Sequence, residues 1–224
     1  MASTFPFENR TSAGEELAIS ISEEVANFHL SPEEALSIIV YALPRGGVPV
    51  AVPIARSLAC PLDAIACKKI TPPNNQELAI GAVTSDGCVL WSDNKPRNEA
   101  MENSLVDEAI AKAREQLDAL SPGLPGISPA GRFVILVDDG IATGMTVAAA
   151  AKSIKSQKPT RIWICVPVAP PESLPFLQEY CDRLIVLQTP QPFLSVSRFY
   201  QDFAQVETQE VETCLQEQRQ WLQC

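Results

Sequence analysis

Apolar residues along this chain follow two alternating patterns, which predict strands and helices in turn. Short apolar runs rich in β-branched residues predict buried strands, and longer stretches with apolar residues three or four positions apart predict helices. The expected strands are Ser37–Leu43, Leu62–Cys67, Phe133–Asp138, Arg161–Val168 and Arg183–Gln188. The expected helices are residues 13–28, 48–59, 101–120, 145–157, 170–180 and 202–222, with a single turn at 31–34. Strands alternating with helices predict an α/β fold with a doubly wound, mostly parallel sheet flanked by helices.

The stretch from residue 68 to residue 91 breaks this alternation. Lys68–Leu78 is polar and holds two prolines, so it predicts a loop. Ile80–Val83 and Cys88–Trp91 are short apolar runs on either side of turn residues 84–87, and they predict a small antiparallel hairpin. Residues 121–131 hold three prolines and three glycines, which indicates a long surface loop before the next strand.

Length, charge and cysteine usage narrow the class of protein. The chain has 224 residues, which suits one domain over residues 1–224. Its net charge of −10 argues against a nucleic-acid partner, which needs clustered Lys and Arg. The longest nearly unbroken apolar run, Ile38–Leu43, is too short to span a membrane. The first ten residues do not resemble a secretory signal, and the seven cysteines show no CxxC spacing, so we expect reduced thiols and a cytoplasmic protein.

The segment Val134–Thr146, VILVDDGIATGMT, carries the clearest chemistry. Its apolar strand ends in Asp138 and Asp139, whose carboxylates can accept hydrogen bonds from sugar hydroxyls or help to hold a divalent cation. A turn with Gly140, Thr143, Gly144 and Thr146 follows and leads into a helix, whose first N–H groups can bind an anion. The combination suits a sugar with hydroxyls at one end and phosphate at the other. The alternative interpretation of the two aspartates is a loop or helix-capping pair.

A nucleoside-triphosphate P-loop is the main competing interpretation of this segment. That motif requires GxxxxGK[ST], whereas the glycines here are one residue too close and Met145 stands in place of the lysine. The segment therefore disfavours a triphosphate site. The only histidine, His29, lies outside the segment, so we expect no histidine-based mechanism.

VILVDDGIATGMT resembles the phosphoribosyl-pyrophosphate (PRPP) binding motif of the type I phosphoribosyltransferase family. Four further stretches are similar to a little-characterised bacterial branch of that family, and together with the motif they extend the resemblance over roughly residues 36–203. These stretches are ALPRGGVPVA at 42–51, NNQELAIGAV at 74–83, VPVAPPE at 166–172 and TPQPFLSVSRFYQDF at 189–203.

The resemblance implies a role for each part of the site. Asp138 and Asp139 would hold the 2′- and 3′-hydroxyls of the ribose, and also Mg²⁺, mostly through PRPP. Residues 142–146 would cradle the 5′-phosphate. Arg45-Gly46-Gly47 would form the pyrophosphate loop, which in the family often contains a cis peptide, and Lys68 or Lys69 would reach the pyrophosphate. The expected catalytic residues are Arg45, Lys69, Asp138 and Asp139. The expected PRPP-binding residues are Arg45, Gly46, Gly47, Lys68, Lys69, Asp138, Asp139, Gly140, Ala142, Thr143, Gly144, Met145 and Thr146.

The acceptor substrate is not given by these motifs. Family members that act on 6-oxopurines usually have an aspartate where this chain has Ala142, which argues against that substrate class. Phe193 is our candidate for stacking on a base, with Phe199 and Tyr200 as alternatives and core packing as an equal interpretation of all three. Glu77 could act as an acid or base, but a salt bridge is the better interpretation.

Two functions follow from the resemblance. The first is a Mg²⁺-dependent phosphoribosyltransferase of nucleotide metabolism, with PRPP and a nucleobase-like small molecule as substrates. The second is a non-catalytic PRPP- or nucleotide-binding regulatory protein. Arg45-Gly46-Gly47 and the two lysines favour the enzyme, because a passive ribose-phosphate binder has less need to stabilise departing pyrophosphate. The fold core is expected over about residues 36–190, with the two ends forming a small hood over the base or a homodimer contact.

Overall fold

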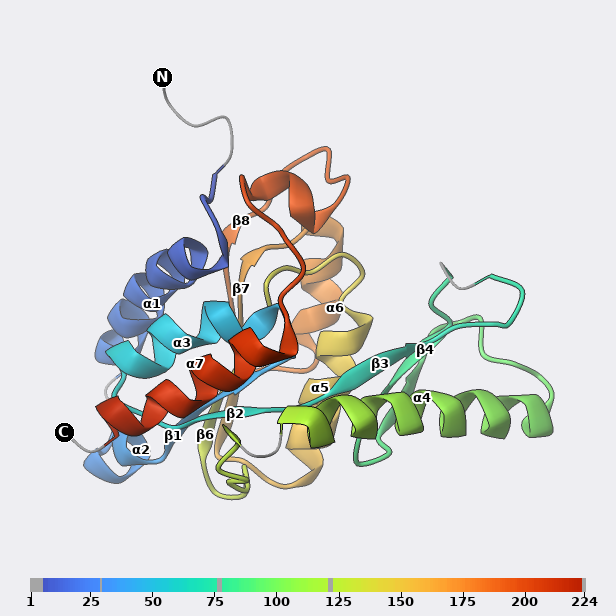
Figure 1. Ribbon diagram of the computed structural model, residues 1–224, viewed down its shortest axis with the longest axis horizontal. Helices are drawn as coiled ribbons and strands as arrows, with labels where there is room; N and C mark the ends of the chain where they lie inside the picture. Colours follow the sequence, from blue (N-terminus) through green and yellow to red (C-terminus); the bar gives the residue numbers. More distant parts are fainter. Residues whose placement is uncertain (1–5, 29, 76–77, 121–122, 223–224) are drawn as a thin grey trace.

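The main sheet of the computed structural model has five parallel strands in the order β2-β1-β6-β7-β8 (Figure 1). The structure describes residues 6–28, 30–75, 78–120 and 123–222. The strands are β1 (Ile38–Ala42), β2 (Leu62–Ala64), β6 (Phe133–Val137), β7 (Arg161–Val168) and β8 (Arg183–Gln188). This confirms the predicted α/β fold with a parallel sheet. The chain order reverses between β1 and β6, and ligand sites of such sheets lie at the carboxyl ends of the strands at that point.

Helices cover both faces of the main sheet, because alternate residues of its strands point to opposite sides. In β6, Phe133 and Ile135 pack among residues of α1 (Arg10–Asn27), α3 (Gly47–Ser57) and α7 (Thr208–Trp221). Val134 and Leu136 pack on the other face, against α5 (Met145–Ser156) and the short α6 (Leu174–Gln178). Both faces of the strand are buried, which is why its sequence is a continuous apolar run.

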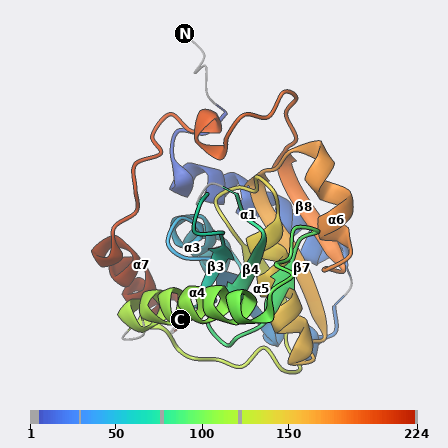
Figure 2. The same ribbon diagram turned by 90° about the vertical axis from the view of Figure 1, so that its right-hand side faces the viewer.

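A second sheet of three antiparallel strands lies to one side of the main sheet (Figure 1). It consists of β3 (Cys67–Ile70), β4 (Gly81–Thr84) and β5 (Val89–Trp91). The long helix α4 (Glu99–Leu120) lies across these strands (Figure 2) and packs on them through Leu105 and Ala109. The predicted hairpin is therefore confirmed, with a third strand added to it.

The prediction of one strand over Leu62–Cys67 was wrong. The chain leaves the main sheet after Ala64, and Cys67 already belongs to β3 of the small sheet. The predicted loop from Lys68 was wrong for the same reason, because Lys68–Ile70 pairs with β4. Residues 62–66 are all buried, and only one of them is polar, so nothing in their local pattern marks the point where the chain changes sheets.

The segment before α1 pairs with the segment after β8 through a bridge between Phe7 and Tyr200. The helix expected from residue 13 begins at Arg10, because Asn9 and Ser12 form a capping box. The helix expected from residue 202 begins only at Thr208, after irregular chain and the 3₁₀ turn η3 (Val196–Phe199). The remaining short elements are α2 (Pro32–Leu36) and the 3₁₀ turn η2 (Pro171–Ser173). Among the described residues, no helix combines the length and the apolar character needed to cross a membrane.

Candidate active site

The Pro44–Gly47 loop and the two aspartates meet where β1 and β6 end. The N–H of Leu43 donates to the carbonyl of Val137 at 2.9 Å, which holds the two strand ends together. A Cβ atom on Gly46 would lie 2.1 Å from Oδ2 of Asp139, and one on Gly47 would lie 2.9 Å from the carbonyl oxygen of Val137. The loop therefore packs directly against the diacid only because both residues are glycines. The peptide bond between Pro44 and Arg45 is cis, as the family resemblance implied.

The two aspartates have different surroundings. Oδ1 of Asp138 accepts a hydrogen bond from the N–H of Asp139 at 2.9 Å, and burial followed by the neighbouring carboxylate raises the pKa of Asp138. Burial also raises the pKa of Asp139, but its Oδ2 accepts a hydrogen bond from Nε of Arg10 at 2.7 Å, which opposes that rise. Of the two carboxylates, Asp139 is the one that is paired directly with a cation.

Arg10 is a site residue that the sequence analysis missed. Its side chain is only 11% exposed, and its guanidinium lies 3.8 Å from the ring centre of Phe203. Nothing in the sequence marked it, because the expected helix began at residue 13, whereas the structure places Arg10 in the first turn of α1, where the helix dipole disfavours a cation. That placement indicates a partner outside the helix, and the partner is Asp139.

The turn after the aspartates leads into α5 as predicted. Gly144 adopts a left-handed conformation with φ of 79°, which glycine tolerates best, and no described side chain caps the helix there. The first N–H groups of α5 therefore suit an anion. Ala142 and Thr143 are exposed in this turn, whereas Gly140 lies under η3, where a Cβ atom would be 2.5 Å from Cγ1 of Val196.

Arg45 and Lys68 line one pocket of about 400 Å³ beside the Pro44–Gly47 loop, together with Lys112 and Gln116 of α4. Burial, followed by the charge of Arg45, lowers the pKa of Lys68. Nε2 of Gln116 donates to the carbonyl of Pro44 at 3.0 Å and so fixes the loop to α4. The structure therefore brings a second cation to Arg45.

Lys69 is not brought to the same place. It lies next to Lys68 in β3, and consecutive residues of a strand point to opposite faces. Val83, which pairs with Lys68, packs toward α4, so Lys69 points to the other side of the small sheet. Of the two lysines considered for the pyrophosphate, Lys68 has the better placement.

Comparison with known proteins identifies the family. The family described as "Phosphoribosyl transferase domain" matches residues 9–204. This chain belongs to that family. Rv0571c of Mycobacterium tuberculosis (strain ATCC 25618 / H37Rv), provisionally named as a phosphoribosyl transferase, is 32% identical over 209 residues, which cover 92% of this chain. The same residues cover 45% of Rv0571c, so the chain spans less than half the length of this curated relative.

Solved structures agree with this assignment at the level of the fold. The crystal structure of TT1426 from Thermus thermophilus has a TM-score of 0.78 and is 32% identical, with 94% of this chain and 98% of that chain covered. The AQ2163 protein from Aquifex aeolicus is 15% identical with a TM-score of 0.51, covering 80% of this chain and 73% of that chain, and shows a similar fold.

The three aromatic residues considered for base stacking in this phosphoribosyl transferase domain fall into two groups. Tyr200 is 2% exposed and donates its hydroxyl hydrogen to the carbonyl of Asp139 at 2.6 Å, so it is a core residue that holds the diacid. Phe193 stacks on Phe199 with ring centres 5.5 Å apart, and both rings are partly exposed. The base-stacking alternative is therefore wrong for Tyr200 and stays a prediction for Phe193. Glu77 and His29 lie outside the described residues.

The carboxylates of Asp138 and Asp139 are the candidate Mg²⁺ ligands of this phosphoribosyl transferase domain. Within the described ranges, no group of three or more His, Cys, Asp or Glu side chains is placed to hold a metal ion. Mg²⁺ commonly keeps several waters and binds one or two carboxylates together with substrate phosphates. Asp138 and Asp139 are two such carboxylates, so they fit a Mg²⁺ ion that is held partly by a bound phosphate ligand.

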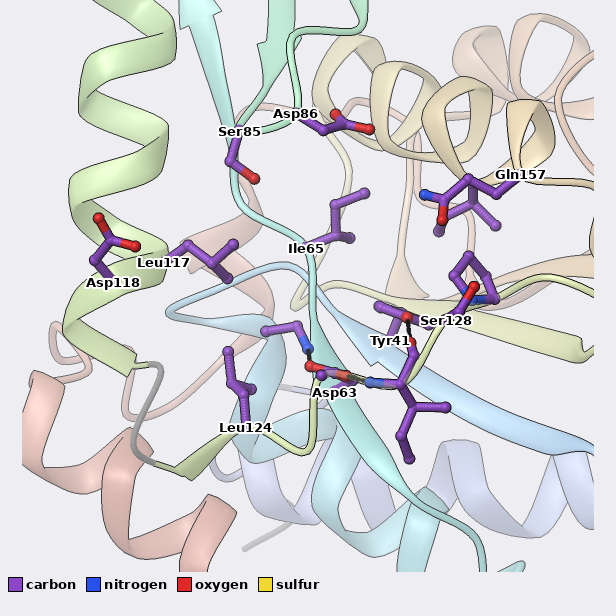
Figure 3. Close-up of a pocket in the computed structure, with 15 residues that line it drawn as sticks. Tyr41, Asp63, Ile65, Ser85, Asp86, Leu117, Asp118, Leu124, Ser128 and Gln157 are labelled. Atoms are coloured by element: carbon purple, nitrogen blue, oxygen red, sulfur yellow. Dashed lines mark hydrogen bonds between the residues drawn. The ribbon is translucent and has the colours of Figure 1, made fainter.

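A further pocket of about 450 Å³ lies away from the diacid, between β1, β2, α4 and the loop after α4 (Figure 3). The carboxylate of Asp63 accepts hydrogen bonds from the N–H groups of Ala64 at 2.8 Å and Ile127 at 2.7 Å. Tyr41 also donates to the carbonyl of Ile127. These contacts fasten the loop over residues 123–131 to the sheet, which accounts for the buried Asp63.

Proposed function

We propose that this chain is a Mg²⁺-dependent phosphoribosyltransferase that moves the 5-phosphoribosyl group of PRPP to a nucleobase-like acceptor. The observation that carries this proposal is the direct packing of the Arg45–Gly47 loop on the Asp138–Asp139 pair. That packing puts a cationic loop, a pair of hydroxyl-binding carboxylates and the start of a helix at one edge of the sheet. PRPP needs all three, because it carries a pyrophosphate, two ribose hydroxyls and a 5′-phosphate.

Each part of PRPP has a proposed binding region in this arrangement. The carboxylates of Asp138 and Asp139 accept hydrogen bonds from the ribose hydroxyls. Backbone N–H groups and hydroxyls of residues 142–146 hold the 5′-phosphate at the N-terminus of α5. Arg45 and Lys68 hold the pyrophosphate, supported by the close backbone approach that Gly46 and Gly47 permit, with Lys69 as a weaker candidate.

The reaction proposed is a substitution at C1 of the ribose. A nitrogen of the acceptor forms a bond to C1, the bond from C1 to the pyrophosphate oxygen breaks, and its electron pair leaves with pyrophosphate. The acceptor nitrogen loses its proton to solvent or to a base that we do not assign. When bound, Mg²⁺ supplies positive charge to the departing pyrophosphate. The chain itself contributes the guanidinium of Arg45 and the ammonium of Lys68, which stabilise the same charge as it develops.

The acceptor is proposed only as a class. Ala142 is exposed and stands where 6-oxopurine enzymes of the family usually have an aspartate. We therefore expect an adenine- or pyrimidine-like acceptor. The partly exposed Phe193–Phe199 stack offers an aromatic surface for such a base, since aromatic rings stack on flat heterocycles.

The test is a panel of nucleobases with PRPP and Mg²⁺, measured by pyrophosphate release and by the mass of the nucleoside monophosphate. Arg45→Ala should lower turnover more than PRPP affinity, because its cation acts on the developing charge. Arg56→Ala is the matched control, since Arg56 lies near the other end of α3 and pairs with Glu217 at 3.6 Å. PRPP binding without a product from any acceptor would support the regulatory alternative instead. Absence of PRPP binding would refute the enzyme and a PRPP-binding regulator alike.

A further inference from the structure

Arg10 lies where three distant segments of the chain meet. It belongs to the first turn of α1, its Nε donates to Oδ2 of Asp139 at 2.7 Å, and its Nη1 donates to the carbonyl of Ala204 at 2.8 Å. Its guanidinium also stacks on the ring of Phe203 at 3.8 Å. A planar guanidinium can make these three contacts at once, whereas an ammonium group is a single point charge.

The Arg10–Asp139 ion pair packs against the pyrophosphate loop. A Cβ atom on Gly46 would lie 2.1 Å from Oδ2 of Asp139 and 3.3 Å from Nε of Arg10. Both partners of the pair therefore contact the loop at the same residue. The direction of the Asp139 carboxylate and the position of the loop depend on each other.

The segment from 200 to 204, which contacts Arg10, also contacts the backbone of Asp139. The hydroxyl of Tyr200 donates to the carbonyl of Asp139 at 2.6 Å, and the ring of Tyr200 packs on Phe203 with centres 5.0 Å apart. The segment from 200 to 204 thus holds Asp139 through its backbone, while Arg10 holds it through its side chain. Because Arg10 engages Oδ2, the proposed hydrogen bond with a ribose hydroxyl involves Oδ1 of Asp139.

We propose that Arg10 is a positioning residue for PRPP binding, which acts by holding the Asp139 carboxylate between α1 and the pyrophosphate loop. This inference rests on the proposed function and adds a residue from α1 to its site. PRPP brings several negative charges close to two adjacent carboxylates. The guanidinium offsets one of these carboxylates and holds its Oδ2 in a fixed direction beside Gly46. Without Arg10, the Asp139 carboxylate next to the loop is no longer paired with a cation and repels the diphosphate more strongly.

The experiment measures PRPP affinity in the presence of Mg²⁺ by titration calorimetry for five proteins. These are the wild type, Arg10→Ala, Arg10→Lys, Asp139→Asn and the double variant Arg10→Ala with Asp139→Asn. Each of the two single changes to Ala or Asn should weaken binding roughly tenfold, the size of one charged hydrogen bond. The double variant should bind no more weakly than the weaker single variant, because the two residues act as a unit. Arg10→Lys should restore only part of the affinity, because lysine keeps the charge, but its single nitrogen replaces the planar guanidinium that reaches Asp139 and Ala204 and stacks on Phe203.

A variant in the same helix tests whether Arg10 acts by positioning Asp139 or only by holding α1 against the rest of the fold. Ile21 is fully buried on α1 and packs in the core shared with α3, a cluster that does not include the diacid. Ile21→Val should loosen this packing and leave PRPP affinity within about twofold of the wild type.

Two results would overturn the inference while leaving the proposed function intact. One is a double variant whose loss of affinity equals the product of the two single losses. The other is an Ile21→Val variant that loses as much affinity as Arg10→Ala. A wild-type protein that binds no PRPP would overturn the proposed function and this inference together.

Discussion

Gly46 lies so close to the Asp139 carboxylate that one added methyl group should break the ion pair with Arg10. The backbone of Gly46 has φ of −62° and ψ of −33°, which any residue adopts, so Gly46→Ala carries no backbone strain of its own. The added Cβ would lie 2.1 Å from Oδ2 and 2.7 Å from Cγ of Asp139. Asp139 cannot move aside freely, because Tyr200 holds its carbonyl at 2.6 Å. The carboxylate must therefore rotate away from Arg10.

The size of the effect follows from two opposing contributions. Loss of a charged, largely buried hydrogen bond costs about 1.5–3 kcal/mol. Replacing glycine by alanine at a compatible backbone position returns about 0.4–1 kcal/mol, because the unfolded chain loses conformational freedom. The net loss in free energy of unfolding should be about 1–2 kcal/mol for Gly46→Ala, since the first contribution exceeds the second.

Urea unfolding of a double-mutant cycle measures this directly. In an Asp139→Ala background the oxygen and Cγ that cause the clash are absent, so Gly46→Ala should become neutral or stabilising by up to about 1 kcal/mol. The effect of one substitution thus changes sign with the presence of one carboxylate. An equal cost of Gly46→Ala in both backgrounds would refute the steric reasoning, as would a cost below about 0.5 kcal/mol in the wild type.

Four further predictions concern other parts of the molecule. Asp63→Ala should lower the free energy of unfolding by about 2–4 kcal/mol in urea titrations, because it leaves two largely buried N–H groups without an acceptor; a loss under about 0.5 kcal/mol would contradict this. Burial raises the pKa of Asp63, so the folded state holds a proton that the unfolded state releases. Wild type should therefore gain stability relative to Asp63→Asn as the pH falls from the raised folded pKa toward the ordinary one, and a difference that shrinks toward acid would show the wrong sign. Lys68→Ala should reduce turnover about tenfold more than Lys69→Ala in steady-state kinetics, because only Lys68 lies beside Arg45. A larger loss in Lys69→Ala would indicate that the pyrophosphate binds on the other face of β3. Trp163→Phe should cost less than about 2 kcal/mol in urea unfolding, because the buried Nε1 of Trp163 has no hydrogen-bond partner among the described residues, and a loss above about 3 kcal/mol would refute that account.

Most of the fold followed from the sequence because its signals are local. The apolar runs of β1 and β6 and the periodic helix α4 are set by neighbouring residues, and each lies within a few residues of its expected bounds. The break after Ala64 did not follow, because its cause is not local. The residues around the break are largely apolar, and only their partners differ: β1 for Ala64 and β4 for Cys67. The hydrophobic periodicity and the composition of a segment do not distinguish one buried strand from two strands that belong to different sheets.

The residues of the candidate site also differ in whether local sequence signals predicted them. Gly46, Asp138 and Gly144 belong to contiguous motifs that follow predicted strands, and the family resemblance assigned all three to one PRPP site. Arg10 belongs to no motif, and its partner is 129 positions away. The helix expected from residue 13 left Arg10 outside it, so the unfavourable place of this cation in the first turn of α1 became visible only in the structure. The separation of Lys68 from Lys69 needed the pairing of β3 with β4, which the predicted loop did not contain.

The contacts of Arg10 also bear on the order in which the molecule folds. Its two hydrogen bonds join residues 129 and 194 positions apart, so they close some of the longest loops in the chain. Long loops cost the most entropy to close, and contacts across them tend to form late. The proposed PRPP site should therefore form only after the central strands have paired. Ligand binding acquired during refolding would lag behind the growth of secondary structure, and PRPP would slow amide hydrogen exchange in α1 more than in β6.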